Sequence, residues 1–298
     1  MRPTILVLCV ALLLMNNSFL HAVGIPLVYN LRISETTRLP THDESDKYPY
    51  RFLVIGTTEF RHKHEEGHTQ RISGIEGSFI YMPRRYYVRI DFAVGHVFDK
   101  TVTTRFGRTQ SDDVLVYGGY THSFSKKFNA TLSALCGVPT HQDLSLQGIQ
   151  LGYAHIAYGG QVDCSYFYAS DYNHQILGAF RYMHFLPRDV CTSAGEQARY
   201  KIGDLPHFLI LNSSRWNKHV GEVGFQIRWS IFTRICPWDA ELVRAELYTR
   251  PSLFGTYKYR ATETTTLLLA LSYAFDVEHH PTNNKSIITL DGVLKFNF

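Results

Sequence analysis

Residues 222–231 read EVGFQIRWSI, and this stretch decides the fold because its apolar and polar residues alternate strictly. Every second residue is apolar, which gives the set Val223, Phe225, Ile227, Trp229 and Ile231. The positions between them are small, polar or charged, and they include Glu222 and Arg228. Successive side chains of a β-strand point to opposite faces of the sheet. The stretch therefore predicts a strand with one apolar and one polar face.

The same alternation recurs along most of the chain. Residues 86–95 (YYVRIDFAVG) place a row of apolar side chains opposite Arg89 and Asp91. Candidate strands cover residues 50–61, 71–82, 86–98, 112–124, 127–138, 146–158, 160–170, 175–186, 200–212, 219–233, 242–259, 265–277 and 286–298. Most of these are about twice as long as the mean strand of a soluble protein, and they have the length that a tilted strand needs to cross a bilayer. We therefore predict an all-β fold whose strands span a membrane.

The number of strands follows from barrel closure. Single-chain bacterial barrels have even strand counts, so one of the thirteen candidates must be wrong. The weakest are 200–212 and 242–259, which contain Pro206 and Pro251, because proline cannot donate a hydrogen bond to a ladder. We predict a closed antiparallel transmembrane β-barrel of about twelve strands. Ten or fourteen strands are the alternatives, and residues 25–34, which also alternate, would supply the fourteenth.

The expected connections are of two kinds. Tight turns are predicted at residues 82–85, 125–126 and 158–160. Longer, polar or irregular loops are predicted at 140–145, 187–199, 235–240 and 278–285. Short turns at one end and longer loops at the other are typical of outer-membrane barrels.

Composition supports a membrane protein without excluding a secreted soluble β-sandwich. Of the 298 residues, 45% are hydrophobic, 14% are aromatic and only 19% are charged. Amphipathic aromatic rings are favoured at the two membrane interfaces. In a sandwich, however, the same apolar faces would point inward. The net charge of +4 comes without a basic run, so we expect no nucleic-acid partner.

The amino terminus reads as an export signal, and the rest as one domain. Residues 1–22 combine Arg2, an apolar core at 5–15 and a cleavage site ending at Ala22, which predicts a cleaved signal peptide. Residues 23–298 contain no linker or repeat, so they are predicted to form a single barrel domain. Export would permit a disulfide between Cys191 and Cys236, but the sequence does not decide whether it forms.

The carboxyl terminus carries the most specific pattern. Apolar residues occupy alternate positions up to a terminal phenylalanine, with Gly292 as the exception: Leu290, Leu294, Phe296 and Phe298. This resembles the carboxyl-terminal assembly signal of bacterial outer-membrane β-barrel proteins, although directly over only about ten residues. The resemblance implies a place in outer-membrane lipid, insertion by the barrel assembly machinery, an amino terminus in the periplasm and loops that face outward. It implies no particular activity, because barrels serve many functions.

The polar faces suggest where function would lie. The charged residues expected to point into the barrel are Arg89, Asp91, Asp163, Arg181, Glu222, Arg228, Asp291 and Lys295. A water-filled lumen lined by both signs of charge would make a passive pore or channel for small solutes. Alternatively, the charges pair across a narrow lumen and fill it.

Two other functions stay open. One is a structural or adhesive barrel that binds through its outer loops, and a less supported one is a hydrolase at the rim. The sequence contains neither a G-x-S-x-G elbow nor a phosphate-binding loop, and we predict no catalytic or cofactor-binding residues. The histidine-rich residues 61–68 could in principle hold a metal, but a solvated loop is favoured, so we predict no metal site.

Overall fold

The computed structural model describes residues 31–33, 37–38, 47–63, 68–100, 105–140, 155–191, 197–201, 203–230, 234–237, 243–244, 248–278 and 285–298. Its strands are β1 (Tyr50–Lys63), β2 (His68–Tyr81), β3 (Tyr86–Lys100), β4 (Arg105–Ser111), β5 (Val114–Ser123), β6 (Phe128–Val138), β7 (Ala157–Phe167), β8 (His174–Phe185), β9 (Arg188–Cys191), β10 (Gln197–Lys201), β11 (Leu205–Trp216), β12 (His219–Ser230), β13 (Arg234–Pro237), β14 (Val243–Arg244), β15 (Tyr248–Arg260), β16 (Thr265–Glu278) and β17 (Lys285–Asn297). None of the described residues forms a helix long and apolar enough to cross a membrane.

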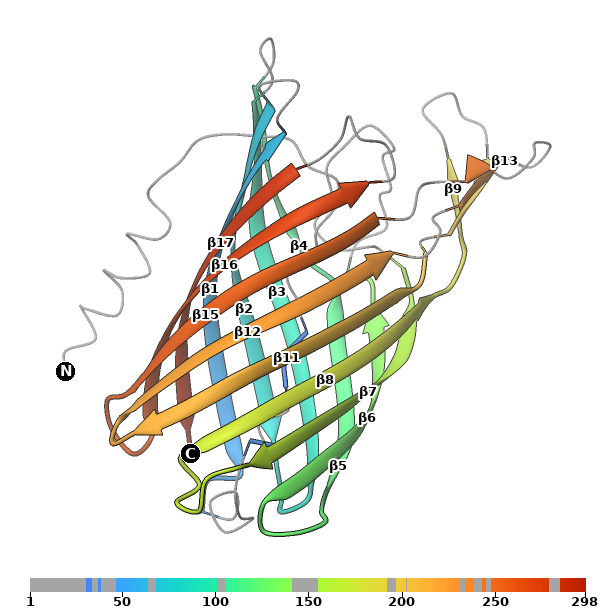
Figure 1. Ribbon diagram of the computed structural model, residues 1–298. Coiled ribbons are helices and arrows are strands. Elements are labelled where there is room, and N and C mark those ends of the chain that lie inside the picture. Colours follow the sequence, from blue (N-terminus) through green and yellow to red (C-terminus); the bar gives the residue numbers. More distant parts are fainter. Residues whose placement is uncertain are drawn as a thin grey trace.

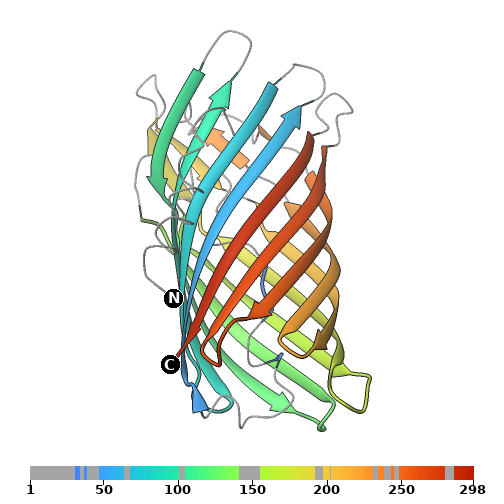
Figure 2. The same cartoon turned by 90° about the vertical axis from the view of Figure 1, so that its left-hand side faces the viewer.

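Twelve strands form a closed antiparallel barrel (Figure 1). In chain order they are β1, β2, β3, β5, β6, β7, β8, β11, β12, β15, β16 and β17, each paired with the next. The ring closes where β17 pairs with β1, and Figure 2 shows these two strands side by side in red and blue. Backbone hydrogen bonds between Tyr50 and Phe298 complete this seam. The predicted fold, a closed antiparallel barrel of about twelve strands, is confirmed.

Strand β4 is not one of the twelve strands of the ring. It pairs with the same edge of β3 as β5 does, but with the other half of that strand. Strand β5 pairs with residues 86–91 of β3, and β4 pairs with residues 94–100. Between the two ladders, two residues of β3 (92 and 93) lie opposite three residues of the facing segment (112–114). The three include Asp112 and Asp113. One extra residue on one side of a ladder is a β-bulge. The candidate strand 112–124 is therefore longer than predicted and kinked.

The candidate 146–158, of which residues 146–154 lie outside the described part of the chain, does not form a separate strand of the barrel, because β6 pairs directly with β7. Within its described part, only Ala157 and Tyr158 are in a strand, and they begin β7. The tight turn predicted at 158–160 is also wrong, because Gly159 and Gly160 lie inside β7 and pair with β8. A Cβ atom on Gly159 would lie 2.0 Å from the carbonyl oxygen of Tyr182. Glycine is needed here for a close approach of two backbones, which a sequence pattern cannot distinguish from a turn.

Both strands that contain proline, the weakest candidates by sequence, are formed in the barrel. Pro206 is in β11 at a position that pairs with β8 but precedes the first pair with β12. Pro251 is in β15 and pairs with β12, while the ladder to β16 skips residues 250 and 251. Each proline thus occupies a place where one neighbouring ladder is not formed, so the missing N–H costs little.

The two ends of the barrel differ. Short connections at residues 82–85, 124–127, 168–173, 217–218 and 261–264 lie at the end where Tyr50 and Phe298 meet, which we call the short-turn end. At the opposite end, β9, β10, β13 and β14 form a separate four-stranded sheet, with β9 and β13 visible at the upper right of Figure 1.

This small sheet bears on the disulfide that the sequence left open. Strand β10 lies between β9, which contains Cys191, and β13, which contains Cys236. Two strand spacings amount to about 9.5 Å. A disulfide requires Cα atoms within about 7 Å, so the backbone arrangement does not favour a bond between these two cysteines.

Candidate functional site

The alternation of each strand gives the barrel an apolar outside and a polar inside. On β3, Val88 and Val94 point outward and are about half exposed (47% and 52%), whereas Arg89 and Asp91 point inward and are buried. The same holds around the ring, where the exposed large side chains include Phe92, Leu132, Phe180, Val223, Leu253, Leu269 and Ile288. A continuous apolar exterior is the surface that a transmembrane barrel presents to lipid. Function in solution must therefore be sought in the lumen and at the two rims.

All eight charged residues predicted to point inward have their side chains inside the barrel. Arg89, Asp91, Asp163, Arg181, Glu222 and Arg228 are buried, while Asp291 and Lys295 are partly buried. Arg89, Arg228 and Asp291 line one lumenal cavity, Lys295 lines another, and Glu222 lines both. Asp163 and Arg181 line neither of these cavities. Whether any of them acts in solute passage stays a prediction.

Around β3, β5 and β8 the inward charges contact neighbouring side chains. The Arg89 guanidinium forms an ion pair with Asp91, with Nε 2.7 Å from Oδ1, and lies over the ring of Tyr117. Arg181 donates to the Tyr117 hydroxyl at 3.3 Å. We call these four side chains the mid-lumen network. Beside it, buried apolar side chains such as Met183 pack inside the barrel, so this side of the lumen is largely filled.

Residues 31–33 and 37–38 lie inside the barrel, which sequence reasoning missed. Residues 31–33 are not part of any strand, so in their described part residues 25–34 do not supply a fourteenth strand. Leu31 and Ile33 are buried against apolar side chains of β8 and β11. Gln161 on β7 donates from Nε2 to the backbone oxygen of Arg32 at 2.8 Å. The alternation that resembles a strand here serves packing against the barrel wall.

Two ion pairs fasten the same segment to the wall. The Arg32 guanidinium binds both carboxylate oxygens of Glu76 on β2, and Arg38 donates to Glu222 on β12 at 2.5 Å. Between them, the backbone oxygen of Thr37 accepts a hydrogen bond of 2.6 Å from Ser165 on β7. We call residues 31–33 and 37–38 the lumenal segment. It is held to strands on several sides of the barrel and therefore narrows the lumen.

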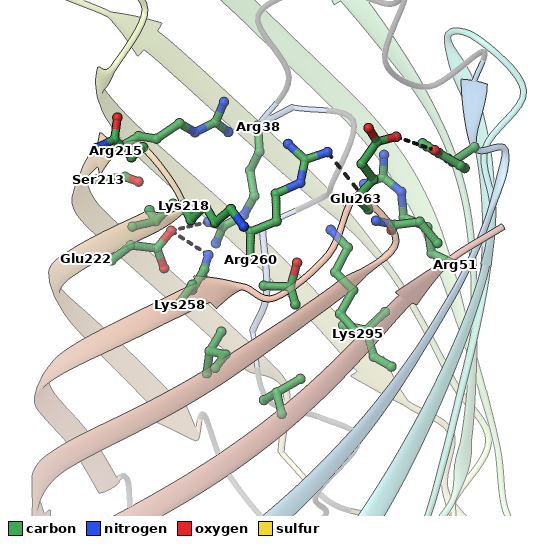
Figure 3. A pocket seen from close by; sticks show the side chains of 18 of the residues that line it. Arg38, Arg51, Ser213, Arg215, Lys218, Glu222, Lys258, Arg260, Glu263 and Lys295 are labelled. Atoms are coloured by element: carbon green, nitrogen blue, oxygen red, sulfur yellow. Dashed lines mark hydrogen bonds and ion pairs between the residues drawn. The ribbon is translucent and has the colours of Figure 1, made fainter. Parts of the chain in front are cut away.

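Two adjoining cavities lie among the described residues on the side formed by β11, β12, β15, β16, β17 and β1. The larger, about 480 Å³, opens among the turns of the short-turn end (Figure 3), and we call it the basic vestibule. The smaller, about 250 Å³, lies beside the lumenal segment, and we call it the inner cavity. Arg38, Glu222 and Lys258 line both cavities. Lys258 and Thr256 donate hydrogen bonds to Glu222 at 2.6 and 2.8 Å. A polar cluster around Glu222 therefore lies at the boundary between the two cavities.

The basic vestibule takes its name from its charge. Its cationic lining residues are Arg38, Lys47, Arg51, Arg215, Lys218, Lys258, Arg260 and Lys295. Among the described lining residues the carboxylates are two, Glu222 and Glu263. At the rim, Lys47 and Tyr48 donate to Glu263 at 2.9 and 3.2 Å. The hydrogen bond from Lys47 holds the pKa of Glu263 below its ordinary value, with a further contribution from Tyr48.

The sequence predicts only some of these lining residues. Lys295 and Glu222 were predicted from strand alternation, but Arg215, Lys218 and Arg260 lie at strand ends or in a turn. A count of basic residues near the short turns could have indicated them. No group of metal-binding side chains occurs within the part of the chain that the structure describes, and the side chains of the histidine-rich residues 61–68 lie outside it.

The fold is that of an outer-membrane β-barrel. No protein-family model and no curated protein matches the sequence. Among solved structures, the chain is similar to the NanC porin, with a TM-score of 0.50 and 9% identity over 82% of this chain and 100% of that one. It also matches the Pseudomonas putida toluene transporter TodX, with a TM-score of 0.46 and 9% identity over 94% of this chain and 99% of that one. At such low identity the likeness to the porin shows the fold alone.

Proposed function

We propose that this protein is a passive channel for small solutes in the bacterial outer membrane. The observation that carries the proposal is the pair of adjoining cavities inside a barrel with an apolar exterior. A lumen lined by charged side chains favours water and small polar solutes over lipid. The similarity in fold to a porin is consistent with this function. No catalytic side chain is needed for passive transport, so we propose no enzyme activity.

The lumenal segment sets the width of this proposed channel. Arg32 and Arg38 anchor it at two separate places on the wall, and Arg38 takes part in the cluster between the two cavities. A solute that moves between the two cavities must pass this cluster. We therefore expect a narrow channel with small conductance rather than a general diffusion pore.

Membrane insertion completes the proposal. Leu290 and the terminal Phe298 are exposed on the outside of the barrel, and Leu294 and Phe296 are partly exposed beside the β1–β17 seam. We propose that this strand is recognised by the barrel assembly machinery and then contacts outer-membrane lipid. The short-turn end would face the periplasm and the small sheet the outside, which is the usual orientation of such barrels.

Single-channel recording in a planar bilayer tests the proposed function. The refolded protein should show a heat-modifiable shift on a gel, which confirms a folded barrel, and discrete conductance steps. A folded barrel that shows no conductance at any voltage or salt concentration would contradict the channel proposal.

A binding function of the outer face is the second candidate, favoured by the small sheet of β9, β10, β13 and β14. Paired strands beyond the barrel offer a surface for a partner. Deletion of residues 188–201 should leave barrel folding and conductance unchanged under both proposals. Only under the binding proposal should it abolish attachment of protein-bearing vesicles to intact cells.

A further inference from the structure

The basic vestibule concentrates cations from parts of the chain that are far apart in sequence. Figure 3 shows Arg215 on β11, Lys218 in the following turn and Arg260 on β15 around the same space. Across it lie Arg51 on β1 and Lys295 on β17. These five side chains, each from a different segment of the chain, contribute positive charge to one cavity. The concentration of positive charge is therefore a product of the fold and does not come from a lysine-rich stretch of a single strand.

The two carboxylates of the vestibule do not balance these cations. Glu222 accepts hydrogen bonds from Lys258 and Arg38, and Glu263 accepts one from Lys47. Each carboxylate is thus already engaged by cations of the same cavity. Among the described lining residues eight side chains are cationic and two are anionic, and Arg215, Lys218 and Arg260 are paired with neither of these two carboxylates, so they give this part of the cavity a positive potential. Low-dielectric walls focus such a potential and raise the local concentration of counter-ions.

We infer that the basic vestibule binds and selects small multivalent oxyanions, solutes that carry carboxylate or phosphate groups. The guanidinium groups of Arg215 and Arg260 can each present two donors to a carboxylate or phosphate, and Lys218 adds a point charge. A volume of about 480 Å³ matches the cavities that hold small molecules. Because the site lies inside the lumen, its ligand is a dissolved solute rather than a lipid headgroup.

This inference rests on the proposed channel function but can fail separately from it. The test compares the wild-type protein with a double variant, Arg215→Gln with Lys218→Gln. Both side chains are exposed at the rim, so their loss should not impair folding. The matched control is Lys126→Gln with Lys127→Gln, which removes two charges from a turn at the same end without touching the vestibule.

The first readout is the reversal potential in a potassium chloride gradient. The wild type and the control should both prefer chloride, and the vestibule variant should lower the chloride to potassium permeability ratio by at least about twofold. A conducting barrel that prefers potassium, or an equal ratio in all three proteins, would overturn the inference and leave the channel function intact.

The second readout does not depend on conduction. Citrate and inorganic phosphate, titrated into refolded protein in a calorimeter, should bind to the wild type and the control, and at least about fivefold more weakly to the vestibule variant because two charge-assisted contacts are lost. Glycerol, which is neutral, should not bind. Citrate binding without any conductance would sink the channel proposal but support the anion site. Equal citrate affinity in the wild type and the vestibule variant would refute the site.

Discussion

The mid-lumen network and the basic vestibule use the same kinds of side chain in opposite ways. In the network, Arg89 has its carboxylate partner two residues away on the same strand, and both are buried. In the vestibule, cations such as Lys218 lie where turns meet bulk water, and among the described lining residues they outnumber the carboxylates eight to two. A buried charge needs a partner because desolvation is costly, whereas a charge at a rim is solvated and screened. Paired charges therefore support the barrel, and exposed charges such as those of Arg215 and Lys218 are available for solutes.

The largest effect is expected from breaking a buried pair. Replacement of Asp91 by Asn would leave the Arg89 guanidinium buried without its carboxylate, and the loss of one partner costs about 3–5 kcal/mol. Urea unfolding of the protein in lipid vesicles measures the change in the free energy of unfolding. Lys218→Gln in the vestibule is the control and should change it by less than about 0.5 kcal/mol. Similar losses for the two variants would mean that the comparison between the regions is wrong.

The next effect concerns the lumenal segment, which lies between the two regions. The double variant Arg32→Gln with Arg38→Gln removes both ion pairs that fasten it, so the segment should be displaced and the conductance should rise several-fold. Single-channel recording gives the result directly. Because Arg38 also contributes charge to the vestibule, Lys218→Gln serves as the control for loss of charge alone. An unchanged conductance in the double variant would show that the segment does not limit ion flow.

A smaller effect on ion selectivity is expected when a carboxylate of the vestibule is neutralised, and it should be larger for the buried carboxylate than for the exposed one. Glu222 is buried between Lys258 and Arg38, while Glu263 is exposed at the rim. Replacement of Glu222 by Gln should raise the chloride to potassium permeability ratio by about twofold, since its charge acts through low-dielectric surroundings. Glu263→Gln should have less effect because water and salt screen it. If the two variants changed the reversal potential equally, the burial of a carboxylate in the lumen would have no influence on its contribution to selectivity.

Strand alternation predicts the barrel wall well but says little about what fills it. Burial on one face decides which side chains point inward, so the positions of Glu222 and Arg89 follow from a period of two. The same period misleads at Leu31 and Ile33, whose apolar contacts are with the inside of the barrel. A strand and a segment that packs against a wall can show the same pattern over a few residues.

The assembly of the residues that line the vestibule cannot be predicted from the sequence, for a different reason. Arg51, Arg215 and Lys295 come together only because the ring closes between β17 and β1 and because the turns share one end. Closure is a property of the whole chain. Similarly, the gap in the ladder beside Pro251 depends on the register of β15 against β16, which no local pattern contains.

The smallest expected effect is a pH dependence of the vestibule, and Glu263 provides it. Its pKa is held below the ordinary value of about 4.3 by the hydrogen bond from Lys47, with smaller contributions from Tyr48 and Arg260. A lowered pKa means that the contact with Lys47 is fully present above the ordinary value and is lost only as the pH falls through the lowered one. Between pH 7 and about 5, Glu263 should therefore stay ionised and make no contribution to a change in selectivity.

At lower pH, Glu263 takes up a proton and the surplus of positive charge in the vestibule grows by one. The chloride to potassium permeability ratio should then rise slightly, and other carboxylates of the lumen will add to the change. The contribution of Glu263 is the difference between the wild type and Glu263→Gln, measured as reversal potentials at pH 5 and pH 3.5. The variant should start from a higher ratio and gain less on acidification. Parallel changes in the two proteins would assign the whole effect to deeper carboxylates and leave the Lys47–Glu263 contact without influence on selectivity.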